Sequence, residues 1–353
     1  MKINFIVPFT GFTGGIKIVF EYANRLKERG HDVVIYVPMK AYKFSGKGIR
    51  GIFKVLKGSI GNTFKRGKKV EWFNLNVDIK LVPLIKNPFI RDADITVATA
   101  WPTAYDVNKL NKSKGKKFYF IQHYEIWSGD SKIVDDSYRL PLNQIVIARW
   151  LKELMKDKFG NNNTTLIYNG INLDEFNSHN RVKQSDKVIC MMYHDLEWKG
   201  FKDGLKAFEL VKNKYPNIKL KLFGIKQGSD IPDYAEFKLN PTREELKEIY
   251  SSSDIFLFPS KSEGWGLTVI EAMACGCAVV GTKTGAIDEI GKHEENCLLS
   301  EPNDVKSLAM NLEKLITDKK LIYKLSKSSI QTAQLFDWGL SVKKMEKLFE
   351  DKI

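Results

Sequence analysis

The stretch IFLFPSKSEGWGLTVIEAMACGCAVV, residues 255–280, predicts a buried strand, a glycine-rich loop, a helix and a second buried strand. The strands are expected at Ile255–Phe258 and Ala278–Val280, and the helix between them carries Glu271. This order of elements is typical of a parallel sheet. The glycines let the backbone approach a ligand closely, and the start of the helix offers unpaired N–H groups, which together suit a diphosphate.

The same alternation of strands and helices runs along most of the 353 residues. An apolar strand at Ile3–Pro8 leads through Gly14-Gly15 into a helix that Gly30 terminates. Further elements are expected as strands at Asp32–Val37, Ile95–Ala98, Phe118–Gln122, Gln144–Ala148, Val188–Met192 and Lys219–Phe223, and as a helix at Gly204–Lys214. The chain is long enough for two α/β domains. The pattern predicts two Rossmann-like domains that face an interdomain cleft at the carboxyl ends of both sheets.

Positive charge is concentrated in residues 40–70, which we call the basic segment. The chain has 56 lysines and arginines against 42 acidic residues, a formal net charge of +14, and no Asp or Glu between Val33 and Val70. Apolar side chains alternate with the cations, which favours contact with an anionic membrane surface. A solvated loop is one alternative. Nucleic-acid binding is the other, but the segment lacks a stacking platform, so no nucleic-acid partner is expected. The expected membrane-contact residues are Lys65, Arg66, Lys68 and Lys69.

The composition favours a protein of the reducing cytoplasm. Four cysteines occur without a secretion signal, and no apolar run approaches the roughly 20 residues that span a bilayer. The spacing of Cys275 and Cys277, near His293 and Cys297, lacks the two-residue gap that is usual between paired zinc thiolates. We therefore expect no metal site and a cytoplasmic location, at the inner face of the plasma membrane if the basic segment contacts lipid.

Several motifs together point to a known family. The stretch Ser262–Val280, with two glutamates separated by seven residues, resembles the signature of the family 4 retaining glycosyltransferases. Other parts of the family pattern occur in the expected order at Gly14-Gly15, Arg29–Val33, Tyr168–Ile171, Lys199–Phe201 and Phe336–Trp338. The resemblance implies the GT-B architecture. It implies an acceptor-binding domain at 1–165, a nucleotide-sugar-binding domain at 166–335, and a C-terminal helix at 336–353 that returns to the first domain.

The resemblance also implies roles for individual residues. Glu271 would hold the donor ribose, and Glu263 would contact the transferred sugar. Lys199 would be a point charge on the phosphates, and His123 would approach the sugar. The remaining implied donor contacts are backbone groups of Gly14, Gly15, Gly266, Leu267 and Thr268, and Asn169 is a weaker candidate that would stabilise the interdomain turn.

One position departs from the family pattern. His194 stands five residues before Lys199, where the family usually has an arginine that clamps the diphosphate with the lysine. An imidazole has an ordinary pKa near 6.5, so it supplies partial charge at most at neutral pH. Three outcomes are open: the phosphates protonate His194, a neutral His194 donates a hydrogen bond, or the donor site is weakened.

The residues are consistent with transfer of a sugar from a nucleotide diphosphate to a hydroxyl of a saccharide, with retention. Lys199 and the helix start can neutralise the diphosphate, so no metal and no other cofactor is required. A lipid-linked or surface-polysaccharide acceptor suits the basic segment. The alternatives are a non-catalytic partner subunit and another sugar-nucleotide enzyme such as an epimerase. The nucleotide base would be contacted near Phe223-Gly224 and Lys238–Asn240, which leave its identity open.

Overall fold

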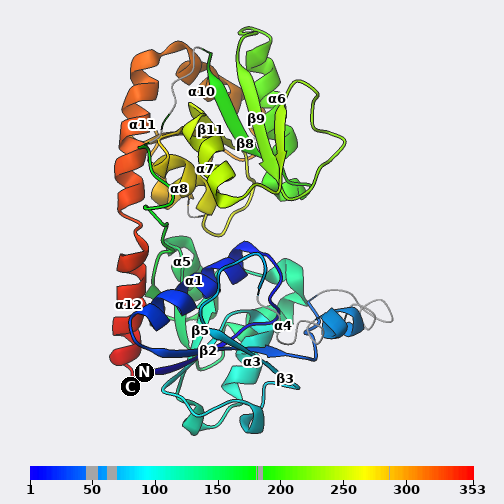
Figure 1. Ribbon diagram of the computed structural model, residues 1–353, viewed down its shortest axis with the longest axis vertical. Coiled ribbons are helices and arrows are strands. Elements are labelled where there is room, and N and C mark those ends of the chain that lie inside the picture. The colour runs from blue at the N-terminus through cyan, green and yellow to red at the C-terminus, as the bar shows by residue number, and fades with distance from the viewer. Residues whose placement is uncertain (45–54, 62–69, 180, 182–185, 286) are drawn as a thin grey trace. The chain divides into compact units, whose positions relative to one another are not determined.

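The computed structural model describes residues 1–44, 55–61, 70–179, 181, 186–285 and 287–353. The chain divides into two compact units, one formed by Met1–Asn169 with Gly339–Ile353 and the other by Gly170–Trp338. Each unit has its own sheet, flanked by helices (Figure 1). All the strand pairings within both sheets are parallel, which confirms the α/β fold predicted from the sequence.

The first unit has a seven-stranded sheet in the order β3-β2-β1-β4-β5-β6-β7. Its strands are β1 (Lys2–Ile6), β2 (Asp32–Pro38), β3 (Asp78–Val82), β4 (Ile95–Ala98), β5 (Lys116–Ile121), β6 (Asn143–Val146) and β7 (Thr165–Leu166). Its helices are α1 (Gly14–Glu28), α3 (Trp101–Asn108), α4 (Ser131–Ser137), α5 (Arg149–Phe159) and α12 (Trp338–Glu350), with 3-10 turns η1 (Asn87–Phe89), η2 (Lys112–Lys114) and η3 (Ile126–Ser128). Residues 55–61 are also helical.

The second unit has a six-stranded sheet in the order β10-β9-β8-β11-β12-β13. Its strands are β8 (Val188–Met192), β9 (Lys219–Gly224), β10 (Glu236–Leu239), β11 (Ile255–Phe258), β12 (Ala278–Thr282) and β13 (Cys297–Ser300). Its helices are α6 (Phe201–Lys212), α7 (Arg243–Ser251), α8 (Leu267–Ala274), α9 (Ile287–Ile290), α10 (Val305–Thr317) and α11 (Lys319–Gln334), with the 3-10 turn η4 (Glu197–Lys199).

The helix predicted at Gly204–Lys214 begins three residues earlier, at Phe201, because Gly200 adopts the left-handed conformation that precedes its first turn. The sequence missed all four edge strands, β3, β7, β10 and β13. Of these, β3 and β10 carry polar residues and are partly exposed, so neither shows a continuous apolar run.

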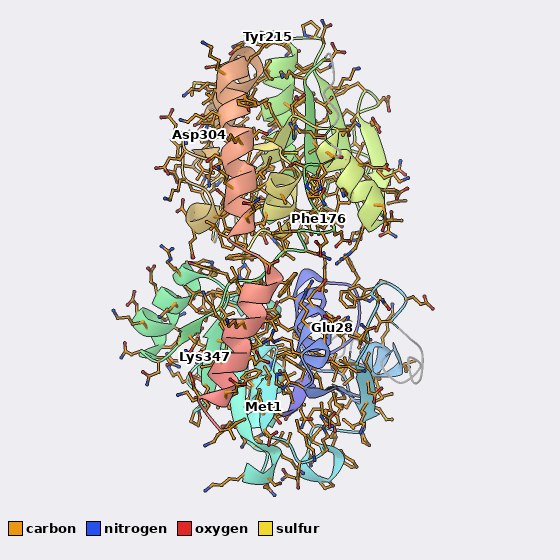
Figure 2. All side chains as sticks on the ribbon, turned by 60° about the vertical axis from the view of Figure 1, so that its left-hand side comes forward. Met1, Glu28, Phe176, Tyr215, Asp304 and Lys347 are labelled. Carbon is orange, nitrogen blue, oxygen red and sulfur yellow. The ribbon has the colours of Figure 1, made fainter. Side chains whose placement is uncertain are left out.

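The C-terminal helix α12 packs in the first unit, as predicted from the sequence. Phe349 lies against Phe118 of β5, with ring centroids 4.9 Å apart. Glu346 accepts hydrogen bonds from Arg29 at 2.9 Å and from His31 at 2.8 Å, and Arg29 holds the pKa of this carboxyl below its ordinary range. Figure 2 shows α1, which ends at Glu28, and α12, which carries Lys347. The Arg29–Val33 motif therefore anchors the end of the chain.

The four cysteines are buried and free. Within the described ranges, no three His, Cys, Asp or Glu side chains form a group that could hold a metal ion. No helix in the same ranges combines the length and the apolar content needed to cross a membrane.

Candidate active site

The loop before α8 depends on Gly266. This residue ends the loop with φ of +86°, a left-handed conformation that L side chains rarely adopt. A Cβ atom here would lie 2.4 Å from Cδ1 of Ile287. Gly266 is the N-cap of α8 and has no side chain to cap it, so within the described residues the first N–H groups of α8, at Leu267 and Thr268, are not used by a side-chain cap. The helix start thus provides the anion-binding geometry expected from the sequence.

Lys199 and Glu263 form an ion pair beside this helix start. The Lys199 Nζ atom lies 2.7 Å from Oε2 of Glu263, and the two side chains are only 19% and 17% exposed. A close approach of the backbone brings them together: a Cβ at Gly200, which has φ of +68°, would lie 1.9 Å from the carbonyl oxygen of Pro259. The sequence predicted both residues near the donor but not their contact with each other.

Glu271 is the fifth residue of α8 and is 5% exposed. Its Oε2 atom lies 3.4 Å from the hydroxyl of Tyr250, which can donate a hydrogen bond to it. Tyr250 comes from α7 and is fully buried. Sequence reasoning missed this tyrosine, because it lies outside the signature and reaches Glu271 only through the packing of α7 on α8.

His194 follows β8, at a position that is electrostatically linked to Lys199. Burial first, and then the positive charge of Lys199, lower the pKa of His194 below 6.5. Its Nδ1 atom lies 3.1 Å from the Leu196 amide nitrogen and 3.1 Å from Oδ1 of Asp195. The lowered pKa favours the neutral ring, in which Nδ1 accepts the Leu196 N–H and the proton is on Nε2. A neutral His194 could donate a hydrogen bond through Nε2.

The two stretches that we expected near the nucleotide base meet at the edge of the sheet. The N–H of Asn240 donates to the carbonyl oxygen of Gly224 at 2.6 Å, directly after the paired strands β9 and β10. Asn240 has φ of 48°, so the chain turns sharply after β10.

Gly14 and Gly15 are the first residues of α1, in the first unit. The side chain of Gln122 donates to the carbonyl oxygen of Gly15 at 3.1 Å, which joins the start of α1 to the end of β5. Among the residues that the structure describes, and apart from its own neighbours in the chain and helix, a Cβ at Gly14 would meet no atom within 4 Å, and its φ is outside the left-handed region. Neither crowding nor backbone conformation therefore requires glycine at residue 14.

His123 lies just after β5 in the same unit. Its ring is nearly perpendicular to those of Trp127 and Trp150, with centroids 4.4 and 5.4 Å away. Glu125, two residues on, accepts the N–H of Trp101 at the start of α3, and burial raises the pKa of its carboxyl to about 7. The sequence singled out His123 alone. Trp127, Trp150 and Glu125 carry no motif that would have identified them.

Asn169, the weaker candidate, is the last residue of Met1–Asn169, the first of the two chain segments that form the first unit. It is 1% exposed, and its Oδ1 atom has no hydrogen-bond partner among the residues that the structure describes. The neighbouring Gly170 is tightly packed, since a Cβ there would lie 2.5 Å from Cα of Trp338.

The expected membrane-contact residues lie outside the described residues: Lys65, Arg66, Lys68 and Lys69. The helical residues 55–61 belong to the same basic segment and are described. Leu56 and Ile60 on this stretch are 53% and 57% exposed, and Ser59 accepts the Ala41 N–H at 2.9 Å.

A family model with the description "Glycosyl transferases group 1" matches residues 174–334, which include Lys199, Glu263 and Glu271. The match thus extends over most of the second unit, Gly170–Trp338.

Two curated proteins with related names are similar to this chain. An uncharacterized glycosyltransferase of Haemophilus influenzae is 30% identical over 211 residues, which cover 57% of this chain and 57% of that protein. The capsular polysaccharide biosynthesis glycosyltransferase CapM of Staphylococcus aureus is 29% identical over 171 residues, 43% of this chain and 45% of CapM. The chain thus spans about half the length of the curated relatives it matches.

The fold is shared along nearly the whole chain. HepE of Anabaena, solved in complex with UDP-glucose, superposes with a TM-score of 0.75 at 14% identity, covering 99% of this chain and 100% of HepE. This agreement, with one parallel sheet in each unit, confirms the predicted GT-B architecture.

Proposed function

We propose that the chain is a retaining glycosyltransferase that moves a sugar from a nucleotide diphosphate to a hydroxyl of a saccharide acceptor. The observation that carries this proposal is the pair Lys199–Glu263 beside the uncapped start of α8. A cation and free N–H groups suit a diphosphate, while a carboxylate suits the hydroxyls of a sugar. The second unit would then be the nucleotide-sugar-binding domain and the first the acceptor-binding domain.

Donor binding would exchange the partners of Lys199. In the structure its charge is compensated by Glu263. A diphosphate carries more negative charge than one carboxylate, so Lys199 would move to the phosphates. Glu263 would then accept hydrogen bonds from hydroxyls of the transferred sugar. Glu271, oriented by Tyr250, would accept hydrogen bonds from the donor ribose.

In the transfer itself, the bond from the anomeric carbon to the phosphate oxygen breaks and a bond to the acceptor oxygen forms on the same face. The acceptor's proton goes to the leaving phosphate. Negative charge develops on that phosphate, where Lys199 and the N–H groups of Leu267 and Thr268 would stabilise it. This arrangement requires no metal, so we propose that activity is retained in the presence of EDTA.

The first unit would contribute Gly14, Gly15 and His123 to the same reaction. The absence of any atom within 4 Å of a Cβ at Gly14 supports a close backbone approach to the donor phosphates. His123 would contact the transferred sugar, and Asn169 would stabilise the chain where the units join.

The first donors to test are UDP-sugars, because HepE shares this fold and was solved with UDP-glucose. CapM, by its name a capsular polysaccharide enzyme, supports a lipid-linked or surface-polysaccharide acceptor. We therefore propose peripheral contact with the anionic inner face of the plasma membrane. Exposed Leu56 and Ile60 in the basic segment support this contact. Sedimentation with phosphatidylglycerol vesicles at low salt tests it, and failure to sediment would contradict it.

A second candidate is a non-catalytic partner subunit, which the neutral His194 favours because it removes one cation from the diphosphate site. Transfer or hydrolysis of a nucleotide sugar by the purified chain would exclude this candidate.

The experiment is a thermal-shift screen of UDP-, GDP- and ADP-sugars, followed by radiolabelled transfer and hydrolysis assays with the donor that stabilises most. The wild type should turn over one donor, and Glu271→Ala should reduce turnover by at least about 100-fold. Glu295→Ala is the matched control, because this glutamate is 69% exposed on the side chain and distant from α8 in sequence. Equal turnover by Glu271→Ala and Glu295→Ala would contradict the assignment.

A further inference from the structure

The loop that carries His123 also carries an exposed tryptophan. Trp127 belongs to η3 and is 54% exposed, although its ring lies 4.4 Å from the His123 ring. Trp150 of α5 lies on His123 as well, at 5.4 Å. The two indoles and the imidazole form an aromatic corner after β5, which we define by His123, Trp127 and Trp150.

The turn that carries Trp127 is rigidly attached to α3. The Ser128 hydroxyl donates to the carbonyl oxygen of Glu125 at 2.7 Å and accepts from the indole N–H of Trp101 at 2.9 Å. Gly129 packs on the same indole, since a Cβ there would lie 2.8 Å from Cζ2 of Trp101. These contacts fix the turn while leaving the Trp127 side chain half exposed. Exposure of so large an apolar ring costs hydrophobic free energy, so a ligand that covers it would gain that energy.

Polar groups next to the aromatic corner indicate which kind of ligand fits. His123 provides ring nitrogens, and the exposed Arg149 precedes Trp150 in the chain, with its Nε atom donating to the hydroxyl of Tyr168 at 3.0 Å. A pyranose ring has an apolar face of C–H groups and a rim of hydroxyls, so it needs an aromatic surface with polar neighbours. An acyl chain needs a continuous apolar surface without them.

We propose that the aromatic corner binds a pyranose ring of the acceptor, with Trp127 stacked on the C–H face of that ring. This inference rests on the proposed function, and it assigns the acceptor's sugar to a particular place on the first unit. Trp127 would then make the chain selective for acceptors that contain a sugar ring over open-chain acceptors such as glycerol phosphate.

The test measures binding without any donor. Methyl and octyl glycosides of glucose, galactose and N-acetylglucosamine, and glycerol 1-phosphate, are titrated into the full chain and followed by ligand-observed saturation-transfer NMR. The wild type should bind at least one pyranoside and discriminate against glycerol 1-phosphate. Trp127→Ala should weaken that pyranoside by about fivefold or more, while Trp127→Phe should retain most of the affinity. Tyr323→Ala, which removes an aromatic ring that is 68% exposed on α11, should bind like the wild type.

UDP binding by calorimetry on the same variants separates this inference from the proposed function. Loss of pyranoside binding with unchanged UDP binding supports the aromatic corner. Pyranoside binding by a chain that binds no nucleoside diphosphate would overturn the proposed function and leave the aromatic corner standing. The proposal for the aromatic corner is overturned if no pyranoside binds, or if Trp127→Ala binds pyranosides as well as the wild type does. It is also overturned if binding to phosphatidylglycerol vesicles is the only binding that Trp127→Ala loses.

Discussion

Lys199 Nζ lies 2.7 Å from Glu263 Oε2, with both side chains less than one-fifth exposed. The family resemblance gives these two residues separate ligands, the phosphates and the sugar. In the structure they are each other's partners. The carboxylate holds the lysine at the start of α8 and at the same time competes with any diphosphate for its charge.

The competition predicts opposite effects of one substitution on two ligands. Glu263→Gln removes the negative partner of Lys199. UDP carries no sugar that could contact Glu263, so its affinity should rise by about threefold or more. Turnover of the UDP-sugar should fall by at least about tenfold, because the sugar loses a charged acceptor. Calorimetry with UDP and a turnover assay check both. Weaker UDP binding by Glu263→Gln would show that the carboxylate does not compete for the lysine.

A second prediction concerns the pH dependence at His194, whose pKa burial and Lys199 lower below 6.5. If the diphosphate lies beside the ring, its charge raises that pKa, so donor binding takes up a proton. UDP-glucose, whose phosphates do not titrate in this range, should therefore bind more tightly as the pH falls from 8 towards 6.

His194→Arg is the matched control for this pH dependence, because the arginine side chain keeps its positive charge throughout this pH range. Its affinity for UDP-glucose should be independent of pH over this range and about tenfold higher than that of the wild type at pH 8. His194→Gln should also show no pH dependence, but with the affinity of the wild type at pH 8. A wild-type affinity that stays constant between pH 8 and pH 5.5 would contradict a contact between the diphosphate and a titrating ring.

Replacing Gly266 or Gly14 by alanine should have different effects on stability and activity. Gly266→Ala places a side chain at φ of +86° and 2.4 Å from Ile287, so it should lower the melting temperature by roughly 4 °C or more. The added methyl of Gly14→Ala meets no atom within 4 Å in the described part of the chain beyond its own helix, so this variant should melt within about 1 °C of the wild type. Its turnover of the nucleotide sugar should nevertheless fall, because the methyl group occupies the space left for the phosphates. Full activity in Gly14→Ala would remove this residue from the donor site.

The fourth prediction uses the partly buried carboxyl of Glu125, whose pKa burial raises from 4.5 to about 7. The folded protein holds this proton more strongly than the unfolded chain does, so the free energy of unfolding falls as the pH rises from about 4.5 through 7. Glu125→Gln keeps an acceptor for the Trp101 N–H and does not titrate. Relative to the wild type, its melting temperature should be similar at pH 5 and higher by roughly 5 °C at pH 8. An equal difference at both pH values would show that Glu125 is not buried as described.

The sequence alone correctly predicted the elements that are determined by their own residues. Ile255–Phe258 and Val188–Met192 are strands with the predicted bounds, because each is a short apolar run ended by loop residues. β3 and β10 were missed, because their stability comes from pairing with β2 and β9 and their own residues are largely polar.

For the candidate site, the motif located Glu263, Gly266 and Glu271 on one loop and helix. It could not show that Tyr250 reaches Glu271, or that Gly200 brings Lys199 to Glu263, because both contacts depend on how separate elements pack. For His194 the sequence left three outcomes open. Its lowered pKa depends on burial, which the sequence does not display.

The most direct measurement is calorimetry of UDP and 2′-deoxy-UDP with the wild type and Glu271→Gln. Glutamine keeps the volume of this buried side chain but removes its charge. We predict that the wild type prefers UDP, that Glu271→Gln binds UDP about tenfold more weakly, and that the variant no longer distinguishes the two nucleotides. If the wild type binds neither UDP nor GDP nor ADP, or if Glu271→Gln keeps both the affinity and the preference for the 2′-hydroxyl, the nucleotide-sugar site at α8 is wrong.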